Sequence, residues 1–162
     1  DQELKNGNKE KMLDLIETKI LPHFNFARMT QLAMGQHWSS AVPEQQNKLI
    51  DEFRTLLVRT YSNALTSYHD ETIKVNPIPP IGDRVETTIR TIVIQGNGKQ
   101  PVPIDYSMEK KPDGWKVYDV TVAGVSLVTN YRGSFNSQIR KGGVEGLLKT
   151  LSDKNKSLEG KK

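Results

Sequence analysis

The feature that most constrains the fold is a run of alternating apolar and polar residues in the second half of the chain. Val85–Gln95 alternates, the short segment Gly96-Asn97-Gly98 follows, and Val102–Met108 alternates again. A period of two residues is typical of a half-buried β-strand, and an Asn-Gly pair favours the tight turn of a hairpin. The pattern therefore predicts two antiparallel strands joined by a short turn.

Further strands are expected on both sides of this hairpin. Asp113-Gly114 predicts the next turn, and the alternation resumes over residues 115–120. We expect another strand over Thr121–Asn130, so that a meander occupies Val85–Asn130. Thr72–Val75 is expected to form a short strand before it.

The other long pattern is helical. Pro43–Tyr68 carries apolar residues at every third or fourth position, and Pro43 suits a first helical turn, where its missing N–H is not needed. Pro22 is expected to stop the first of the other helices. Four shorter helices are predicted, over Lys5–Ile20, Phe26–Gly35, Tyr131–Lys141 and Val144–Leu151.

Strands in one block and helices around it predict an α+β fold, in which a curved antiparallel sheet forms a cone with a long amphipathic helix. We expect a single domain over residues 1–151. Its helical lobe would come from residues 1–42 and 131–151, and helix 43–68 would accompany the sheet of residues 72–130. The charged segment 152–162 is expected to be a disordered tail.

Composition excludes several classes of protein. The 162 residues include no cysteine, which rules out disulfides and Cys-ligated zinc. The net charge is +4, but the lysines are scattered, so nucleic-acid binding is not expected. No stretch approaches the roughly 20 apolar residues of a membrane span. Because the sequence begins with Asp1, we expect that a signal segment has been removed.

Motifs for catalysis are weak. His23, His37 and His69 have unrelated spacings and match no metal-binding motif, and no metal site or cofactor is expected. Ser126 follows a Gly-Val pair as in a nucleophile elbow, but Val128 stands where the elbow requires a second glycine.

Two acids on the predicted sheet stay open as alternatives. Asp105 or Asp119, if buried in an apolar cone, would have a raised pKa and act as a general base. The competing reading is an ion pair, for instance with Arg90 or Arg132, or plain exposure.

Several segments resemble the MlaC, or toluene-tolerance, family of phospholipid-binding proteins. They are Leu21–Met29, Ala33–Gly35 with Trp38, Phe53–Leu57 with Tyr61, Leu65–Tyr68, and Trp115–Arg132 followed by Phe135, Ile139 and Gly142-Gly143. The family commonly has an acid where Ala123 stands and Asp where Asn25 stands. Neither difference touches an apolar position.

The resemblance implies an NTF2-like curved sheet with a helical lobe and no catalytic residue. It also implies a periplasmic carrier that moves phospholipid between an outer-membrane lipoprotein–porin complex and an inner-membrane ABC-transporter complex, and so maintains outer-membrane lipid asymmetry. We expect the carrier to be a monomer.

The physics of such cargo constrains the site. A diacyl lipid has roughly 30 methylenes, and exposing them at about 0.8 kcal/mol each costs on the order of 20 kcal/mol. The resemblance therefore implies a deep, dry cavity between sheet and helices. From the residues alone, a core filled by side chains explains the same apolar pattern.

The candidate lipid contacts come from both parts of the chain. The sheet candidates are Ile89, Val93, Val102, Ile104, Tyr106, Met108, Trp115 and Val117. On the strand expected over Thr121–Asn130, Val125 and Leu127 share one face and Val122 and Val128 the other, and either face is a candidate. The helical candidates are Met29, Phe53, Leu56, Leu57, Tyr61 and Leu65.

Arg132, beside Tyr131, is a candidate phosphate contact, since an arginine can grip a phosphate with two parallel hydrogen bonds. An ion pair with Asp119 is an equally good reading. The head group is expected to be mostly exposed to solvent.

Two rival functions remain at this point. A small enzyme on the same fold predicts one buried acid in a compact pocket. A non-catalytic adaptor predicts a solid core and a protein-binding outer face.

Overall fold

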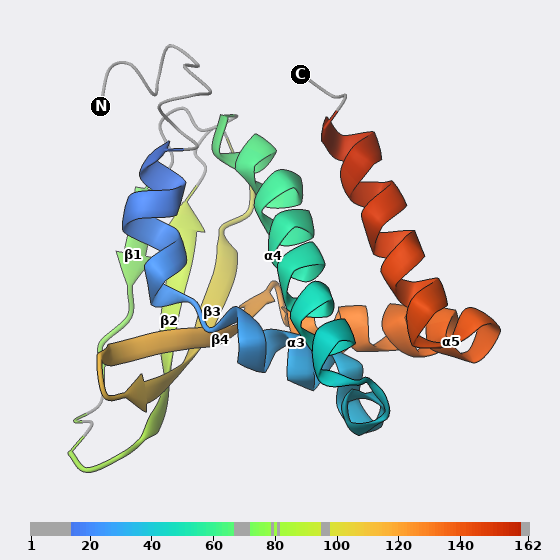
Figure 1. Cartoon of the computed structure of the whole chain (residues 1–162). Coiled ribbons are helices and arrows are strands. Elements are labelled where there is room, and N and C mark those ends of the chain that lie inside the picture. The colour runs from blue at the N-terminus through green and yellow to red at the C-terminus, as the bar shows by residue number, and fades with distance from the viewer. Residues whose placement is uncertain (1–13, 67–71, 79, 81, 95–97, 160–162) are drawn as a thin grey trace. The chain divides into compact units, whose positions relative to one another are not determined.

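A computed structural model describes residues 14–66, 72–78, 80, 82–94 and 98–159 (Figure 1). The chain divides into two compact units. We call the first, Asp1–Asn25 with Tyr68–Leu127, the sheet unit, and the second, Phe26–Ser67 with Val128–Lys162, the helical unit. Strands in one and long helices in the other confirm the predicted α+β class.

The sheet unit is built on an antiparallel meander of five strands in the order β1-β2-β3-β4-β5. The predicted strands from residue 72 to residue 120 and the turn before Gly114 are confirmed. The strands are β1 (Thr72–Val75), β2 (Glu86–Ile94), β3 (Val102–Lys111), β4 (Gly114–Val122) and β5 (Val125–Ser126). Residues 95–97, where a hairpin turn was predicted, lie outside the described residues.

The strand predicted over Thr121–Asn130 is wrong. β4 ends at Val122, Ala123 and Gly124 turn the chain with φ of 50° and 85°, and β5 is only two residues long. A helix begins at Leu127. The apolar residues Val128, Tyr131 and Phe135 have the i, i+3, i+7 spacing of a helix, which the alternation of Val122 to Val128 hid.

One irregularity interrupts the pairing of β3 with β4. Ser107 pairs with Asp119 and Met108 pairs with Val117, so Tyr118 is an extra residue in β4. Such a bulge bends the strand and increases its twist. Figure 1 shows β4 running at a large angle to β2, in keeping with the predicted curvature.

The segment before the sheet is helical but irregular. After residues 14 and 15, Ile16–Ile20 forms the π-helix η1 and Leu21–His23 the 3-10 helix η2, with Pro22 in its first turn. Phe24 then forms a parallel bridge with Val117. The helix predicted over Lys5–Ile20 is thus confirmed near its end, and its residues 5–13 lie outside the described part of the chain.

The helical unit contains α3 (Phe26–Met34), the 3-10 helix η3 (Gly35–Ser40), α4 (Pro43–Thr66) and α5 (Leu127–Glu159). Within the described residues, these elements confirm the helices predicted in this unit. Those predictions were Phe26–Gly35, Pro43–Tyr68, Tyr131–Lys141 and Val144–Leu151. Gly143 has φ 69° and ψ −171°, so α5 consists of two helices that meet at the predicted Gly142-Gly143 break. Glycine reaches this backbone conformation without the clash that a Cβ would cause.

An aromatic cluster lies at the centre of the helical unit. The Phe53 ring packs edge-on against Tyr131 and Phe135, with ring centroids 5.1 Å apart in both pairs. Phe53 and Phe135 are buried, as are Met29, Leu49 and Leu147. Side chains thus fill the core of this unit.

The expected tail at residues 152–162 is wrong for residues 152–159, which continue α5. Asn155 is buried, and its Nδ2 donates to the Glu52 backbone oxygen at 2.9 Å and to Glu52 Oε2 at 2.6 Å. Arg59 Nη1 donates to the Asn155 backbone oxygen at 2.5 Å. These bonds order a segment whose composition alone resembles a linker.

The expected grouping of the helices also differs from the structure. Helix 43–68 was expected to accompany the sheet, but α4 lies in the helical unit, where α3 packs against it. That the two units form one lipid-binding domain stays a prediction.

In the described ranges, no helix has both the length and the apolar character needed to cross a membrane.

We predict that Phe53→Ala destabilises the protein by about 3–5 kcal/mol, because it removes a buried ring and leaves a cavity among Tyr131 and Phe135. Urea unfolding followed by circular dichroism measures this change. Lys48→Ala, at an exposed position of the same helix, should change stability by less than about 0.5 kcal/mol. Equal effects of the two substitutions would contradict a core centred on Phe53.

Candidate functional site

The strand register gathers apolar side chains on one face of the sheet. Cross-strand partners project to the same face, and the register pairs Ile89 with Tyr106, Val93 with Val102, and Tyr106 with Val120. We call this the apolar face. It consists of Ile73, Val75, Thr87, Ile89, Thr91, Val93, Val102, Ile104, Tyr106, Met108, Trp115, Val117, Val120, Val122 and Val125, with Lys110 opposite Trp115.

All eight sheet residues predicted to contact lipid lie on this face, together with Val125. The structure adds Val120 to this face, and it brings Val122 to the same face as Val125, whereas the sequence analysis expected those two valines on opposite faces. The bulge at Tyr118 is the reason, because it shifts the alternation so that Val117 and Val120 share a face. A bulge leaves no clear signal in a single sequence, so the face on which Val120 lies could be determined only from the strand register.

The opposite face of the sheet is mainly polar, apart from Ile92, Ile94 and Pro103 near one end of β2 and β3. Arg90 lies opposite Asp105 in the register, and Ser107 lies opposite Asp119. Asp119 Oδ1 accepts a hydrogen bond from the Val120 N–H at 2.8 Å, and Oδ2 accepts one from the Ser126 hydroxyl. Asp119 thus fastens the turn between β4 and β5.

This placement bears on the catalytic alternatives. Asp105 and Asp119 lie on the polar face, so neither is a base inside an apolar pocket on the other face. Ser126 does stand at a strand-to-helix junction, but its hydroxyl donates to Asp119. The described residues include no cluster of three His, Asp or Glu side chains suited to a metal ion.

The apolar face is only partly covered. Val117 is 6% exposed, whereas Ile89, Val93, Val102, Ile104, Tyr106, Met108 and Trp115 are half-buried and Val125 is 58% exposed. Thr91 is buried, and its hydroxyl donates a hydrogen bond to the Ile104 carbonyl at 2.7 Å. Because the hydroxyl is satisfied in this way, Thr91 contributes its methyl group to the apolar face. A fully filled core would bury these side chains more deeply.

Tyr106 is a titratable group on this face. Burial raises the pKa of its phenol above the usual 10.0, because the phenolate loses hydration there. The phenol is therefore neutral at neutral pH. The charged side chain on the apolar face is that of Lys110, which is exposed and lies opposite Trp115.

The helical candidates show a different environment. Met29, Phe53, Leu56 and Leu57 are buried within the helical unit, and Tyr131 is half-buried beside Phe53. Leu127 is the first residue of α5, so its predicted place on a strand is wrong. The side chains of Tyr61 and Leu65 lie outside the described residues. Lipid contact at these helical positions stays a prediction.

Arg132 lies on α5, and its Nε donates to the Leu32 backbone oxygen at 2.8 Å. It lines a polar pocket of about 470 Å3 in the helical unit, together with His37 and Asn136. His37 Nε2 is 2.7 Å from Asn136 Oδ1. Of the other histidines, His23 is exposed on η2 and His69 lies outside the described residues.

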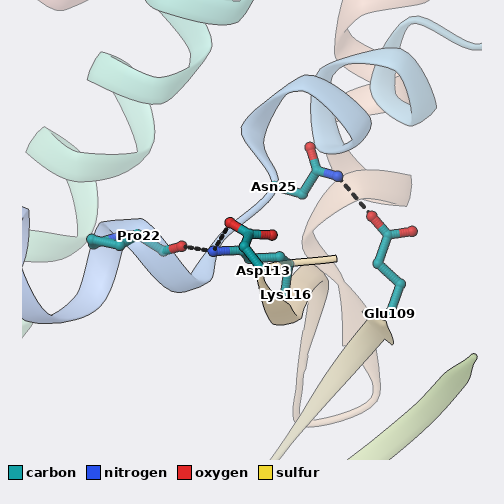
Figure 2. A network of polar contacts seen from close by, with 5 residues as sticks. All are labelled: Pro22, Asn25, Glu109, Asp113 and Lys116. Carbon is teal, nitrogen blue, oxygen red and sulfur yellow. Dashed lines mark hydrogen bonds and ion pairs between the residues drawn. The ribbon is translucent and has the colours of Figure 1, made fainter. Parts of the chain in front are cut away.

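A polar network fixes the end of the sheet unit where the chain passes to α3 (Figure 2). Asn25 Nδ2 donates to Glu109 Oε1 at 2.7 Å, and the Asn25 N–H donates to the Val117 carbonyl at 2.8 Å. Glu109 is buried, with Lys111 Nζ 3.7 Å from Oε1. The amide of Asn25 thus meets a buried carboxylate that an Asp at this position would repel.

Lys116 completes this network. Its Nζ donates to the Pro22 carbonyl at 2.5 Å and lies 3.2 Å from Asp113 Oδ2, as Figure 2 shows. The hydrogen bond from Lys116 lowers the pKa of the exposed Asp113 carboxyl below its usual value. One lysine therefore ties η2 to the turn between β3 and β4.

The fold matches a solved structure. The phospholipid-binding protein of Ralstonia solanacearum, solved in complex with a phospholipid, superimposes with a TM-score of 0.86 at 41% identity, over 98% of this chain and 88% of that one. The fold is therefore that of a phospholipid-binding protein, with an open antiparallel sheet and helices.

The family follows from the sequence comparisons. The model of the MlaC protein family matches residues 1–153, and the chain belongs to this family. This confirms the resemblance seen in the sequence.

Two relatives have been given functional names. The intermembrane phospholipid transport system binding protein MlaC of Haemophilus influenzae is 29% identical over 83% of this chain, and the toluene tolerance protein ttg2D of Pseudomonas putida is 30% identical over 68% of it. The chain spans 64% of the first relative and 50% of the second.

We predict that Asn25→Asp destabilises the protein by about 1–3 kcal/mol at pH 7, because it places a second carboxylate against buried Glu109. Like charges raise the pKa of the pair in the folded variant above the unfolded value of about 4. A raised folded pKa makes the penalty small below about pH 4 and lets it grow as pH rises through the raised pKa. Thermal unfolding of the wild type and the variant at about pH 4 and at pH 7 measures this difference in stability.

The double variant N25D/E109Q is the matched control, since it reverses donor and acceptor and should recover most of the lost stability at pH 7. A loss in N25D that is the same at both pH values would show that the Asn25–Glu109 contact is not responsible.

Proposed function

We propose that the chain is a periplasmic phospholipid carrier that holds acyl chains against the apolar face of its sheet. The apolar face itself is the observation that carries this proposal. It presents apolar side chains from all five strands, most of them half-buried, with Lys110 as its charged residue and no carboxylate. The solved relative from Ralstonia solanacearum, which holds a phospholipid, supports the same ligand.

The hydrophobic effect favours the burial of the apolar face by the acyl chains of a lipid. Each acyl methylene removed from water contributes about 0.8 kcal/mol. Side chains such as Ile89 and Ile104 keep exposed surface that an acyl chain would also remove from water. Met108 adds a flexible, polarisable side chain that adapts to chains of variable shape. Lipid contact at the helical candidates is part of this proposal.

The names of the relatives support a place in transport between membranes. We propose that the protein takes up phospholipid from one membrane complex and delivers it to another, between an outer-membrane lipoprotein–porin assembly and an inner-membrane ABC-transporter complex. It acts as a monomer without catalysis, and its work maintains the lipid asymmetry of the outer membrane. The bilayer solvates the lipid at both ends, so the carrier needs only a modest margin of affinity.

We predict that Ile89→Gln lowers the amount of phospholipid that co-purifies with the protein at least about threefold, because it places an amide among acyl methylenes. Organic extraction followed by mass spectrometry, normalised to protein, measures the lipid. Wild-type protein should carry phospholipid at near-stoichiometric yield.

The matched control is Thr88→Gln, one residue away on the polar face of β2, which should carry as much lipid as the wild type. Circular dichroism confirms that both variants fold. Equal lipid content in the two variants, or no lipid in the wild type, would refute the proposed function.

We also predict that bound lipid raises the pKa of Tyr106 further, because acyl chains remove more water from its phenol. A pKa that is higher in the loaded protein means that lipid affinity falls as pH rises past the pKa of Tyr106 in the lipid-free protein, which itself lies above 10.0. Phenolate absorbance of loaded and lipid-stripped protein measures the difference, and Tyr106→Phe should abolish it. An unchanged difference in that variant would place the lipid away from Tyr106.

A further inference from the structure

The polar pocket of the helical unit lies where α3 passes into η3 and where α5 begins. Met34–His37 line one side, and Thr129, Arg132, Gly133 and Asn136 line the other. Only Met34 among these has a long apolar side chain, and it is 1% exposed. The pocket therefore differs in chemistry from the apolar face, because the charged guanidinium of Arg132 and further polar side chains line it.

Arg132 is held in place by a single anchor. Its Nε donates to the Leu32 carbonyl at 2.8 Å, and it forms no ion pair with any residue that the structure describes. An arginine fixed through Nε still has the two terminal Nη groups to offer, and their planar arrangement matches two oxygens of a phosphate.

Glycines keep the space around this arginine open. Gly35 has φ +56°, and a Cβ built there would lie 3.7 Å from Arg132 Cδ, so the arginine side chain lies directly over this glycine. A Cβ at Gly133 would meet nothing within 4 Å, which shows that this position faces open space. A ligand can thus approach the backbone at Gly133.

Further hydrogen-bonding side chains line the pocket beside Arg132. The His37 ring is oriented by Asn136, whose Oδ1 lies 2.7 Å from Nε2. The amide of Gln36 and the hydroxyl of Thr129 also line the pocket. Such groups serve the remaining oxygens of a phosphate ligand.

The local charge favours an anion. Residues 18–43 and 120–144, which supply the whole pocket lining, contain no Asp or Glu but do contain Arg28 and Arg132. An acid beside Arg132 would neutralise it, and neither segment provides one. A stretch of one charge sign raises the local concentration of the opposite ion.

We propose that this pocket is a phosphate-binding site, in which Arg132 makes the bidentate contact. The ligand class is a phosphate or phosphate ester. Its source is either the head group of a phospholipid, in which case the site deepens the proposed carrier function and rests on it, or a free phosphate compound. The phosphate chemistry is the same in both cases.

The test is a titration of lipid-stripped, full-length protein followed by 1H–15N NMR, at constant ionic strength set with chloride. The probes are inorganic phosphate and glycerophosphoethanolamine, a head group without acyl chains. We expect saturable shifts at residues 34–37 and 129–136 with at least one probe below about 10 mM. A stronger response to the diester identifies a head-group site, and a stronger response to inorganic phosphate identifies a site for free phosphate.

Two pairs of variants test the geometry. Arg132→Gln should weaken binding about tenfold or more, whereas Arg140→Gln, an exposed arginine on the same helix, should not change it. Gly133→Glu should also weaken binding about tenfold by placing a carboxylate in the pocket, while its neutral counterpart Gly133→Gln should weaken it much less. Both changes at Gly133 put better helix formers into a helix, so folding is preserved.

The proposal is overturned if neither probe gives saturable shifts, if R132Q binds like the wild type, or if G133E and G133Q are equal. Lipid content is measured in the same preparations. Protein that carries phospholipid but does not bind either probe refutes the phosphate site alone, and protein that binds phosphate but never carries lipid refutes the carrier function alone.

Discussion

The pairing of β3 with its neighbours is the constraint on which the rest of the structure depends. Because cross-strand partners share a face, the register sets Ile89 against Tyr106 and Tyr106 against Val120, and so separates a mainly apolar face from a mainly polar one. The bulge at Tyr118 keeps this separation across β4. Without it Val120 would turn to the polar side, and Asp119, which fastens the next turn, would enter the apolar side.

The two units use their apolar residues differently. In the helical unit Phe53, Phe135 and Leu147 are buried, and the rings of Phe53 and Phe135 pack edge-on against each other. In the sheet unit most of the apolar face stays half-exposed, although it comes from residues of the same hydrophobic character. A surface of this kind suits a ligand that is itself apolar, which connects the register of the strands to the proposed carrier function.

Much of this fold could be predicted from the sequence, because the hydrophobic period of long segments such as Pro43–Thr66 and Val102–Lys111 indicates a helix or a strand directly. The sheet candidates for the site were predicted for the same reason. The errors lie where two periods overlap: from Val122 to Val128 an apparent alternation conceals a turn at Ala123 and a helix start. The Asn25–Glu109 hydrogen bond joins residues far apart in the chain, so no local sequence pattern could predict it.

The central claim is that acyl chains lie on the apolar face of the sheet. The most direct measurement is photo-crosslinking of the loaded protein with a phospholipid that carries a diazirine in its acyl chain, followed by peptide mass spectrometry. Our account predicts labels at Ile89, Ile104 and Tyr106 and none at their polar-face neighbours Arg90 and Asp105. Labels spread equally over both faces, or absent from the sheet, would contradict it.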